Sequence, residues 1–185
     1  MTKAQLTVLA GPTAVGKGTV VAALTKRYPT LNVSVSATTR DPRPGELNGV
    51  HYYFVSAQEF DAMIERGDML EWALVHGKNK YGTPRGPVDE ALAAGKPVLL
   101  EIDLAGARQV RTNRPDAQFI FLAPPSWEDL ERRLIGRGTE GPEEQARRLA
   151  TARVELEAAS EFDHVVINDD VERAVDELAR LIGLE

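Results

Sequence analysis

The amino-acid sequence predicts a three-layer α/β fold, in which helices cover both faces of a central parallel sheet. Short apolar runs of strand length alternate with longer segments of helical pattern, an order typical of parallel sheets. The runs PVLLEI (97–102) and FIFLA (119–123) do not alternate polar and apolar residues, as expected for strands buried on both faces. A glycine-rich loop joins the first predicted strand to the first predicted helix, which indicates a P-loop fold.

These patterns place the elements along the chain. The predicted strands cover residues 5–10, 51–55, 69–75, 97–103, 117–123 and 164–168. The predicted helices begin near Lys17, Ala57, Pro84, Ala105, Trp127, Pro142 and Val171. Two helix starts carry a Ser-x-x-acid capping box, Ser56 with Glu59 and Ser126 with Asp129, which satisfies free N–H groups of the first turn. Gly95 is placed to end the helix that begins near Pro84.

The chain length of 185 residues suits one well-buried domain. Residues 34–87 differ from the rest because they hold most of the tyrosines and the turn-rich segment TTRDPRPGELNG. We therefore expect an inserted region there, with mixed or antiparallel strands, inside a single domain.

Composition narrows the function classes. Hydrophobic residues make up 43% of the chain and charged residues 27%, which is ordinary for a soluble globular protein. No apolar run approaches the ~18 residues of a membrane span, and the first residues resemble a strand more than a signal peptide, so a cytoplasmic protein without membrane association is expected. The absence of Cys excludes disulfides and thiol chemistry. The net charge of -6 argues against nucleic acid as a partner.

The first candidate site is a phosphate-binding loop. Gly11, Gly16 and Lys17 fit the pattern G-x-x-x-x-G-K between a predicted strand and a predicted helix. In such a loop, backbone N–H groups and the helix N-terminus surround phosphate oxygens, and the Lys reaches the outer phosphates. Gly18 stands where the common pattern has a Ser or Thr that ligates Mg²⁺. Thr19 keeps a hydroxyl nearby, and its contact with the metal is either direct or through water.

A second group of anion-binding side chains lies between Ser34 and Ser56. Arg40 and Arg43 are accompanied there by Tyr52 and several hydroxyls. A guanidinium binds phosphate oxygens through two parallel N–H groups, and hydroxyls can complete such a site. Two phosphate sites in one protein indicate phosphoryl transfer between them, which mainly requires positioning and charge stabilisation.

Together with other segments of the chain, these two groups of residues resemble the guanylate kinases, which transfer phosphate from ATP to GMP. The matching segments run in order from residue 8 to residue 170 and include GPTAVGKGT, SVSATTRDPRPGE, HYYFV, LLEIDLAGA, GRGTE and VINDD. The resemblance implies a core of residues 1–33, 88–126 and 158–185, a GMP-binding region of residues 34–87 and a mobile helical lid of residues 127–157. It also implies ATP and GMP or dGMP as substrates and Mg²⁺ as cofactor.

The resemblance assigns roles by matching position. The implied ATP-binding residues are Gly11, Pro12, Thr13, Ala14, Val15, Gly16, Lys17, Gly18, Thr19, Arg133, Arg137 and Asn168, the last of them near the adenine. The implied GMP-binding residues are Ser36, Arg40, Arg43, Tyr52, Glu71, Tyr81, Thr83 and Asp103; in this set Glu71 and Thr83 read the guanine edge. The implied catalytic residues are Lys17, Arg40, Arg137 and Arg148. Thr19 and Asp103 are implied at the Mg²⁺ site, through water or directly, and the role of Glu101 stays open.

Several residues have simpler explanations. An exposed strand residue would account for Glu71 without any ligand. Between Trp127 and Ser160 there are six Arg and no Lys, and four i,i+4 pairs explain most of them as a salt-bridged helix surface. These pairs are Glu128–Arg132, Asp129–Arg133, Glu143–Arg147 and Glu144–Arg148. Arg137 has no acid at that spacing and is the lid residue least typical of such a surface.

Two other functions stay open as alternatives. One is a non-catalytic guanylate-kinase-like interaction module, against which the intact phosphate loop argues. The other is a kinase of a different phosphorylated acceptor. The preferred phosphate donor and the oligomeric state, monomer or homo-oligomer, cannot be chosen from the sequence.

Overall fold

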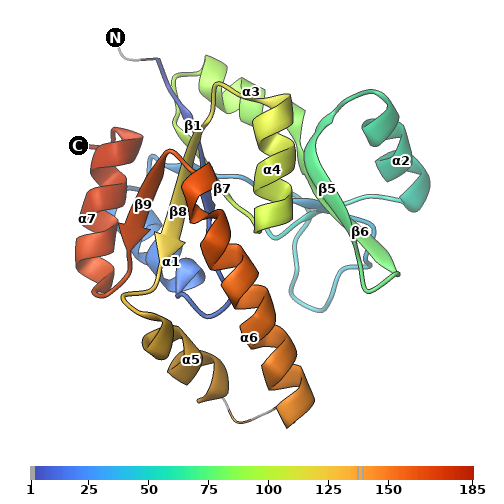
Figure 1. Cartoon of the computed structure of the whole chain (residues 1–185). Helices are drawn as coiled ribbons and strands as arrows, with labels where there is room; N and C mark the ends of the chain where they lie inside the picture. Colours follow the sequence, from blue (N-terminus) through green and yellow to red (C-terminus); the bar gives the residue numbers. More distant parts are fainter. Residues whose placement is uncertain (1–2, 137, 139) are drawn as a thin grey trace.

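A computed structural model describes residues 3–136, 138 and 140–185 (Figure 1). A five-stranded parallel sheet, in the order β2-β7-β1-β8-β9, forms the centre. The elements of this layer and its covering helices are β1 (Leu6–Ala10), α1 (Lys17–Arg27), β2 (Asn32–Val33), α3 (Arg85–Ala93), β7 (Val98–Glu101), α4 (Leu104–Asn113), β8 (Gln118–Ala123), β9 (His164–Ile167) and α7 (Val171–Ile182).

Both faces of the parallel sheet are buried under helices. Leu9 of β1 belongs to one hydrophobic cluster with Val20 of α1 and Leu178 of α7. Its neighbour Val8 belongs to a second cluster with Val110 of α4 and residues of α3. Successive residues of one strand thus enter opposite cores, which explains why the strand sequences are apolar without alternation. The predicted three-layer α/β fold is confirmed.

A second, four-stranded sheet has the order β4-β3-β6-β5 and contains both parallel and antiparallel pairs. Its elements are β3 (Ala37–Thr38), β4 (Tyr53–Phe54), α2 (Ala57–Glu65), β5 (Met69–Val75) and β6 (Asn79–Pro84). Phe60 of α2 packs against Met69 and Trp72 of β5, so this sheet has a small core of its own. In Figure 1 it lies to one side of the parallel sheet, next to α4.

Two helices and a short 3₁₀ turn complete the chain: α5 (Trp127–Ile135), α6 (Pro142–Glu157) and the turn Ala158–Glu161. In Figure 1, α5 and α6 extend away from the carboxyl ends of the parallel strands. Leu130 of α5 and Ala152 of α6 form a separate cluster, against which Ala14 of the glycine-rich loop packs. Among the described residues, no helix is long and apolar enough to cross a membrane.

Most helix starts agree with the sequence prediction. The Ser56 and Ser126 side chains accept the backbone N–H groups of Glu59 and Asp129, respectively, as predicted. The helix predicted from Ala105 begins one residue earlier, because the Asp103 carboxylate accepts the Gly106 N–H at 2.8 Å and caps it. The helix expected from Pro84 begins at Arg85.

Two predicted strands are three residues shorter than expected, and three strands were missed. The strand predicted over residues 97–103 is limited to β7, because Asp103 already caps α4. Of residues 51–55, only Tyr53–Phe54 form β4, because the start of the run belongs to a turn in which the His51 N–H donates to the Leu47 carbonyl at 3.1 Å. The strands β2 and β3 have two residues each, too few for a periodic pattern. The sequence of β6, NKYGTP, contains Gly and Pro and lacks an apolar run; its pairing with β5 makes it a strand.

Candidate active site

The glycine-rich loop lies at the carboxyl end of β1, between β1 and α1. Its backbone turns sharply at Ala14 (φ 69°) and Gly16 (φ 91°), both in the left-handed region. A Cβ atom on Gly16 would lie 2.8 Å from the Asn168 amide nitrogen, so this position requires glycine both for conformation and for space. The loop lines a cleft of 350 Å³ together with Glu101, Asp103 and Glu155. The loop geometry is that of an anion-binding nest.

Two side chains from distant elements hold the loop at one carbonyl group. Asn168, which follows β9, donates its amide N–H to the Val15 carbonyl at 2.8 Å. Arg133 of α5 donates to the same oxygen at 3.2 Å. Asn168 is 5% exposed, and the contact observed for it is support of the loop; its implied contact with adenine stays a prediction.

Lys17 points into the same cleft. Its ammonium group donates to the Ile102 carbonyl, directly after β7, at 3.1 Å. Burial lowers the pKa of Lys17, while the carboxylates of Glu101, Asp103 and Glu155 act against that shift. A partly desolvated cation binds phosphate more strongly than one in water, because the interaction is less screened by solvent. The nearby carboxylates oppose phosphate binding and are better suited to hold a cation beside the phosphates.

The position after Lys17 tolerates a side chain. Gly18 lies in the first turn of α1, and among the described residues a Cβ atom there would meet only the Glu101 carboxylate oxygen, at 3.9 Å. We therefore expect Gly18→Ser to retain most of its activity, with at most an altered Mg²⁺ dependence, in steady-state assays over a range of Mg²⁺ concentrations. Gly16→Ser is the matched control and should lose activity. A folded but inactive Gly18→Ser protein would show that this position needs glycine.

The arginines of residues 127–157, the segment expected to form a lid, differ in their contacts. The predicted Glu144–Arg148 pair forms at 3.4 Å, and Arg148 also contacts Glu140 at 2.7 Å. The other three predicted i,i+4 pairs are wrong. Arg133 contacts the glycine-rich loop instead of Asp129. The other two arginines form ion pairs with acids three residues earlier in the chain, Arg132 with Asp129 and Arg147 with Glu144. An i,i+3 spacing also lies on one helix face. Arg137 lies outside the described residues.

The Glu71 side chain of β5 faces the start of α4. It is 9% exposed and accepts the Thr83 hydroxyl at 2.8 Å, from the opposite residue of the β5–β6 pair. Burial raises the pKa of the Glu71 carboxyl; the Thr83 hydrogen bond acts against this shift and the nearby Asp103 adds to it. Glu71 is therefore not an exposed strand residue, and the simpler explanation is wrong. A buried carboxylate of this kind is typical of a binding site.

Gly106, at the start of α4, lies between Glu71 and Asp103. A Cβ atom there would be 3.1 Å from a carboxylate oxygen of each. The two carboxylates thus share one small space. Asp103 also lines the cleft of the glycine-rich loop, so it connects the two halves of the site.

Arg40, Tyr52 and Tyr81 form a second cluster. The Arg40 guanidinium lies over the Tyr52 ring, 5.3 Å from its centre. The Tyr52 and Tyr81 rings meet edge to face at 6.0 Å. Ser36 accepts the Tyr53 N–H through its backbone carbonyl, and Arg43 lies in the turn that leads to Glu46. The arrangement brings cationic and hydroxyl groups to one place, as an anion requires.

Two residues at the site were missed from the sequence. Glu155 of α6 lines the loop cleft beside Lys17, but in the sequence it is one of several acids in a helical segment, such as Glu157, and nothing distinguishes it. Glu46 binds the Arg40 guanidinium. Its position at the end of TTRDPRPGE, a segment that carries the resemblance, was a signal that could have drawn attention to it.

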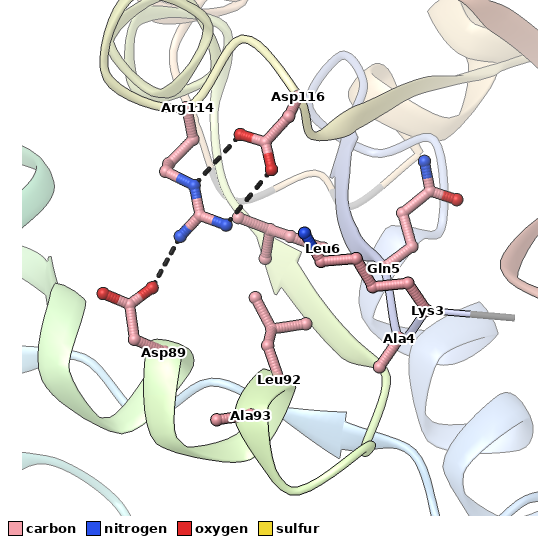
Figure 2. Close-up of a pocket in the computed structure, with 9 residues that line it drawn as sticks. All are labelled: Lys3, Ala4, Gln5, Leu6, Asp89, Leu92, Ala93, Arg114 and Asp116. Atoms are coloured by element: carbon pink, nitrogen blue, oxygen red, sulfur yellow. Dashed lines mark hydrogen bonds and ion pairs between the residues drawn. The ribbon is translucent and has the colours of Figure 1, made fainter. Parts of the chain in front are cut away.

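A different hollow lies at the amino end of β1 and is lined by Lys3, Leu6, Leu92 and Arg114, among others. Figure 2 shows the Arg114 guanidinium between Asp89 and Asp116. Two carboxylates already surround this cation, so it is poorly suited to bind a phosphate. The loop cleft, at the other end of β1, is the better candidate for nucleotide chemistry.

A glycine-rich loop between a strand and a helix, together with a separate cluster of arginine and tyrosine, is the arrangement typical of P-loop nucleoside-monophosphate kinases. The family model described as guanylate kinase matches residues 3–185. The chain belongs to the guanylate kinase family.

Guanylate kinases from other organisms are similar to this chain over nearly its whole length. The guanylate kinase of Thermobifida fusca is 61% identical over 179 residues, 97% of this chain and 91% of the relative. The guanylate kinase of Streptomyces coelicolor is 59% identical over 180 residues, which are 97% of this chain and 91% of the relative. The crystal structure of guanylate kinase from Anaplasma phagocytophilum has a TM-score of 0.74 at 31% identity and covers 100% of this chain and 87% of that one.

A shikimate kinase from Bacteroides thetaiotaomicron matches with a TM-score of 0.50 at 14% identity, over 97% of this chain and 98% of that one; this likeness shows the fold alone. Membership in the guanylate kinase family, at this level of identity, makes the chain a phosphotransferase that uses ATP to phosphorylate GMP in nucleotide metabolism.

Proposed function

We propose that the transfer from ATP to GMP takes place between the two clusters described above, with Asp103 between them. Residues 11–19, Arg133 and Asn168 would bind ATP. The proposed GMP site consists of Ser36, Arg40, Arg43, Tyr52, Glu71, Tyr81, Thr83 and Asp103. The observation that carries this proposal is the buried Glu71–Thr83 pair, because a carboxylate and a hydroxyl side by side, shielded from water, match the N–H and carbonyl groups of a guanine edge.

In the proposed reaction, an oxygen of the GMP phosphate attacks the γ-phosphorus of ATP. The bond from this phosphorus to the bridging oxygen breaks, and ADP leaves with that oxygen. The attacking oxygen is already anionic, so no general base is required. Lys17 and the loop N–H groups would bind the charge that develops on the transferred group. Arg148, which contacts Glu140 at 2.7 Å, would reach the phosphate only after leaving that partner.

The residues at the loop cleft fit Mg²⁺. Magnesium prefers oxygen ligands and is usually held by one or two carboxylates together with substrate phosphates, not by a cage of protein groups. Asp103 and Glu101 supply carboxylates to the cleft and Thr19 supplies a hydroxyl, while the described residues contain no cluster of three or more His, Cys, Asp or Glu that could hold a metal. When bound, Mg²⁺ would neutralise part of the charge of the phosphates.

The proposal also covers the two segments outside the core, a second acceptor and the location of the protein. Residues 34–87 would act as the GMP-binding region and residues 127–157 as the lid, whose closure would exclude water from the γ-phosphate. dGMP would be accepted as well as GMP. Because the reaction draws on the ATP and GMP pools of the cytoplasm, the proposed location is the cytoplasm.

The acceptor side can be tested by binding alone. Arg40→Ala is expected to weaken GMP binding by about 10- to 100-fold, since a bidentate charge-assisted pair contributes roughly 1.5–3 kcal/mol. The measurement is titration calorimetry with GMP in the absence of ATP. Arg66→Ala is the control, because Arg66 is also in the 34–87 region but pairs with Glu59 and Asp68 at the surface. Equal affinities of wild type and Arg40→Ala would contradict the proposed phosphate site.

A further inference from the structure

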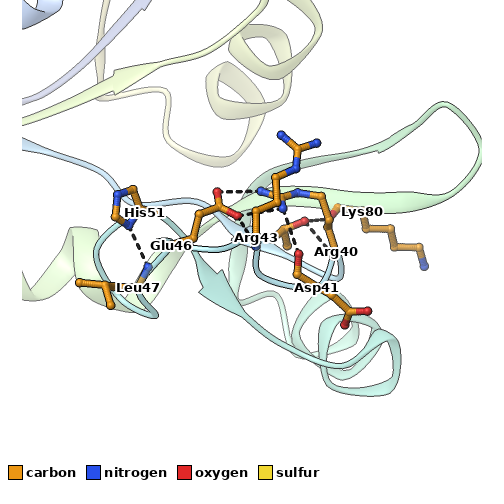
Figure 3. A network of polar contacts seen from close by, with 8 residues as sticks. Arg40, Asp41, Arg43, Glu46, Leu47, His51 and Lys80 are labelled. Carbon is orange, nitrogen blue, oxygen red and sulfur yellow. Dashed lines mark hydrogen bonds and ion pairs between the residues drawn. The ribbon is translucent and has the colours of Figure 1, made fainter.

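The ion pair between Arg40 and Glu46 differs from the other ion pairs of the inserted region. Two parallel hydrogen bonds of 2.9 Å join the two Nη atoms of Arg40 to the two carboxylate oxygens of Glu46 (Figure 3). The side chains are only 14% and 18% exposed, whereas those of the Arg66–Glu59 pair are 53% exposed on both sides. A two-point, largely shielded contact restricts a long side chain far more than a single exposed one.

Glu46 is itself fixed in place by the backbone of Arg43. The Arg43 N–H donates to Glu46 Oε1 at 2.7 Å, and the Glu46 N–H donates to the Arg43 carbonyl at 3.0 Å. The carboxylate therefore connects the two arginines of the proposed phosphate site: it is held by the backbone of one and holds the side chain of the other. Arg40 and the Arg43 backbone N–H lower the pKa of Glu46 to about 2, so the carboxylate stays ionised at any pH at which the enzyme works.

The hydrogen bonds of Arg40 determine which of its edges can meet a ligand. A guanidinium has five N–H groups. The Nη1 atom donates one N–H to the Asp41 carbonyl, at 2.9 Å, and its other N–H to Glu46. The Nη2 atom donates one of its two N–H groups to Glu46. The other two, on Nε and Nη2, lie along a single edge and form the parallel pair that suits two phosphate oxygens.

The surroundings of that edge also suit a phosphate. The Tyr52 ring covers one face of the guanidinium at 5.3 Å, which limits its rotation. The Tyr81 ring meets the Tyr52 ring edge to face at 6.0 Å, and Tyr81 is among the groups that raise the pKa of Arg40, after its main cause, the hydrogen bonds to Glu46. Both tyrosines belong to the proposed GMP site, so the Arg40 guanidinium lies among groups expected to bind the same phosphate.

We infer that Glu46 is a positioning residue of the acceptor site: it orients Arg40 so that the Nε–Nη2 edge receives the GMP phosphate. The inference rests on the proposed role of Arg40. Glu46 touches neither substrate itself. Its effect is to fix the guanidinium before GMP arrives, which reduces the entropy lost on binding.

A purely structural role is the competing explanation, because Glu46 also closes the turn from Arg43. Glu46→Gln separates the two roles. The Gln carbonyl oxygen can still accept the Arg43 N–H, but its NH₂ group would face the Nη2 donor of Arg40, so the turn is kept and the two-point pair is lost. Glu161→Gln is the matched control, since Glu161 forms a two-point pair with Arg108, at 3.0 and 2.8 Å, outside the site.

The test measures kcat and KM for both substrates in wild type, Glu46→Gln, Glu46→Asp, Arg40→Ala, the Arg40→Ala/Glu46→Gln double variant and the control Glu161→Gln, which should keep the wild-type values. Glu46→Gln should raise the KM for GMP by about 10-fold through the lost charge-assisted pair, leave the KM for ATP unchanged, and have no further effect once Arg40 is absent. Glu46→Asp, which keeps the carboxylate, should recover part of the loss.

Three outcomes would overturn the inference. An unchanged KM for GMP in Glu46→Gln, together with a raised KM in Arg40→Ala, removes the role of Glu46 but leaves the proposed site intact. Additive effects in the double variant mean that Glu46 acts through the turn and not through Arg40. An unchanged KM in Arg40→Ala removes the proposed phosphate site and this inference together.

Discussion

Replacing Glu71 with glutamine is expected to lower kcat/KM for GMP by at least about 100-fold, because a mispaired buried polar group is costly. Guanine presents its N1–H and N2–H groups side by side, and an ionised carboxylate can accept both. Glutamine keeps the size of Glu71 but replaces one acceptor oxygen with a donor. The loss should appear mainly in KM, since the guanine edge is bound in the same way before and during the transfer.

The same substitution should narrow the discrimination against AMP. Adenine has an acceptor at N1, which an ionised Glu71 would meet with a lone pair, and the burial of Glu71 makes that mismatch expensive. The comparison requires kcat/KM for GMP and AMP in wild type and Glu71→Gln. Glu65→Gln serves as control, since Glu65 is exposed on α2. Wild-type efficiency with GMP in Glu71→Gln would mean that guanine is read elsewhere.

The raised pKa of Glu71 adds a pH dependence to this prediction. The carboxylate must be ionised to accept both guanine N–H groups, so GMP binding should weaken as the pH falls. Because the folded-state pKa lies above the ordinary value for glutamate, this weakening should begin at a higher pH than for an exposed glutamate. Glu71→Gln should lack this step, and only the titration of the GMP phosphate should remain.

Lys17→Ala is expected to lower kcat by at least about 100-fold, the usual consequence of losing one preorganised donor at a transition state. The fold should survive, because Lys17 makes one hydrogen bond, to the Ile102 carbonyl, and its removal relieves the cost of a partly buried charge. Lys26→Ala is the matched control at the exposed end of the same helix. The measurements are steady-state kinetics and thermal unfolding of both variants. A nearly normal kcat in a folded Lys17→Ala protein would contradict the role assigned to the loop.

The sequence predicts those parts of the structure that depend on local patterns. Helix starts follow from capping residues such as Ser56, and the buried strands follow from unbroken apolar runs. The short strands β2, β3 and β6 could not be found in this way, because their conformation depends on pairing with partners distant in the chain. Lys17 and the loop glycines could be assigned from spacing alone, since the chemistry of that loop is contained in consecutive residues.

The parts of the site that depend on tertiary contacts were harder to predict. The spacing of Asp129 and Arg133 predicted a surface pair, but Arg133 reaches the Val15 carbonyl, 118 residues away in the chain. Glu46 and Glu155 are ordinary acids in the sequence, and only the fold places them beside Arg40 and Lys17. The burial of Glu71 likewise arises from α4, which packs over β5 through hydrogen bonds such as Gln109 to the Trp72 backbone.

The most direct test of the account is the rate of ADP release by the wild-type protein with ATP, Mg²⁺ and one acceptor at a time: GMP, dGMP, AMP, CMP, UMP or none. The geometry around Glu71 and Thr83 predicts rapid release with GMP and dGMP, at least about 1,000-fold lower kcat/KM with AMP, and only trace release without an acceptor. Comparable rates with AMP and GMP, or release that does not depend on an acceptor, would contradict the assignment of this site to the phosphorylation of GMP.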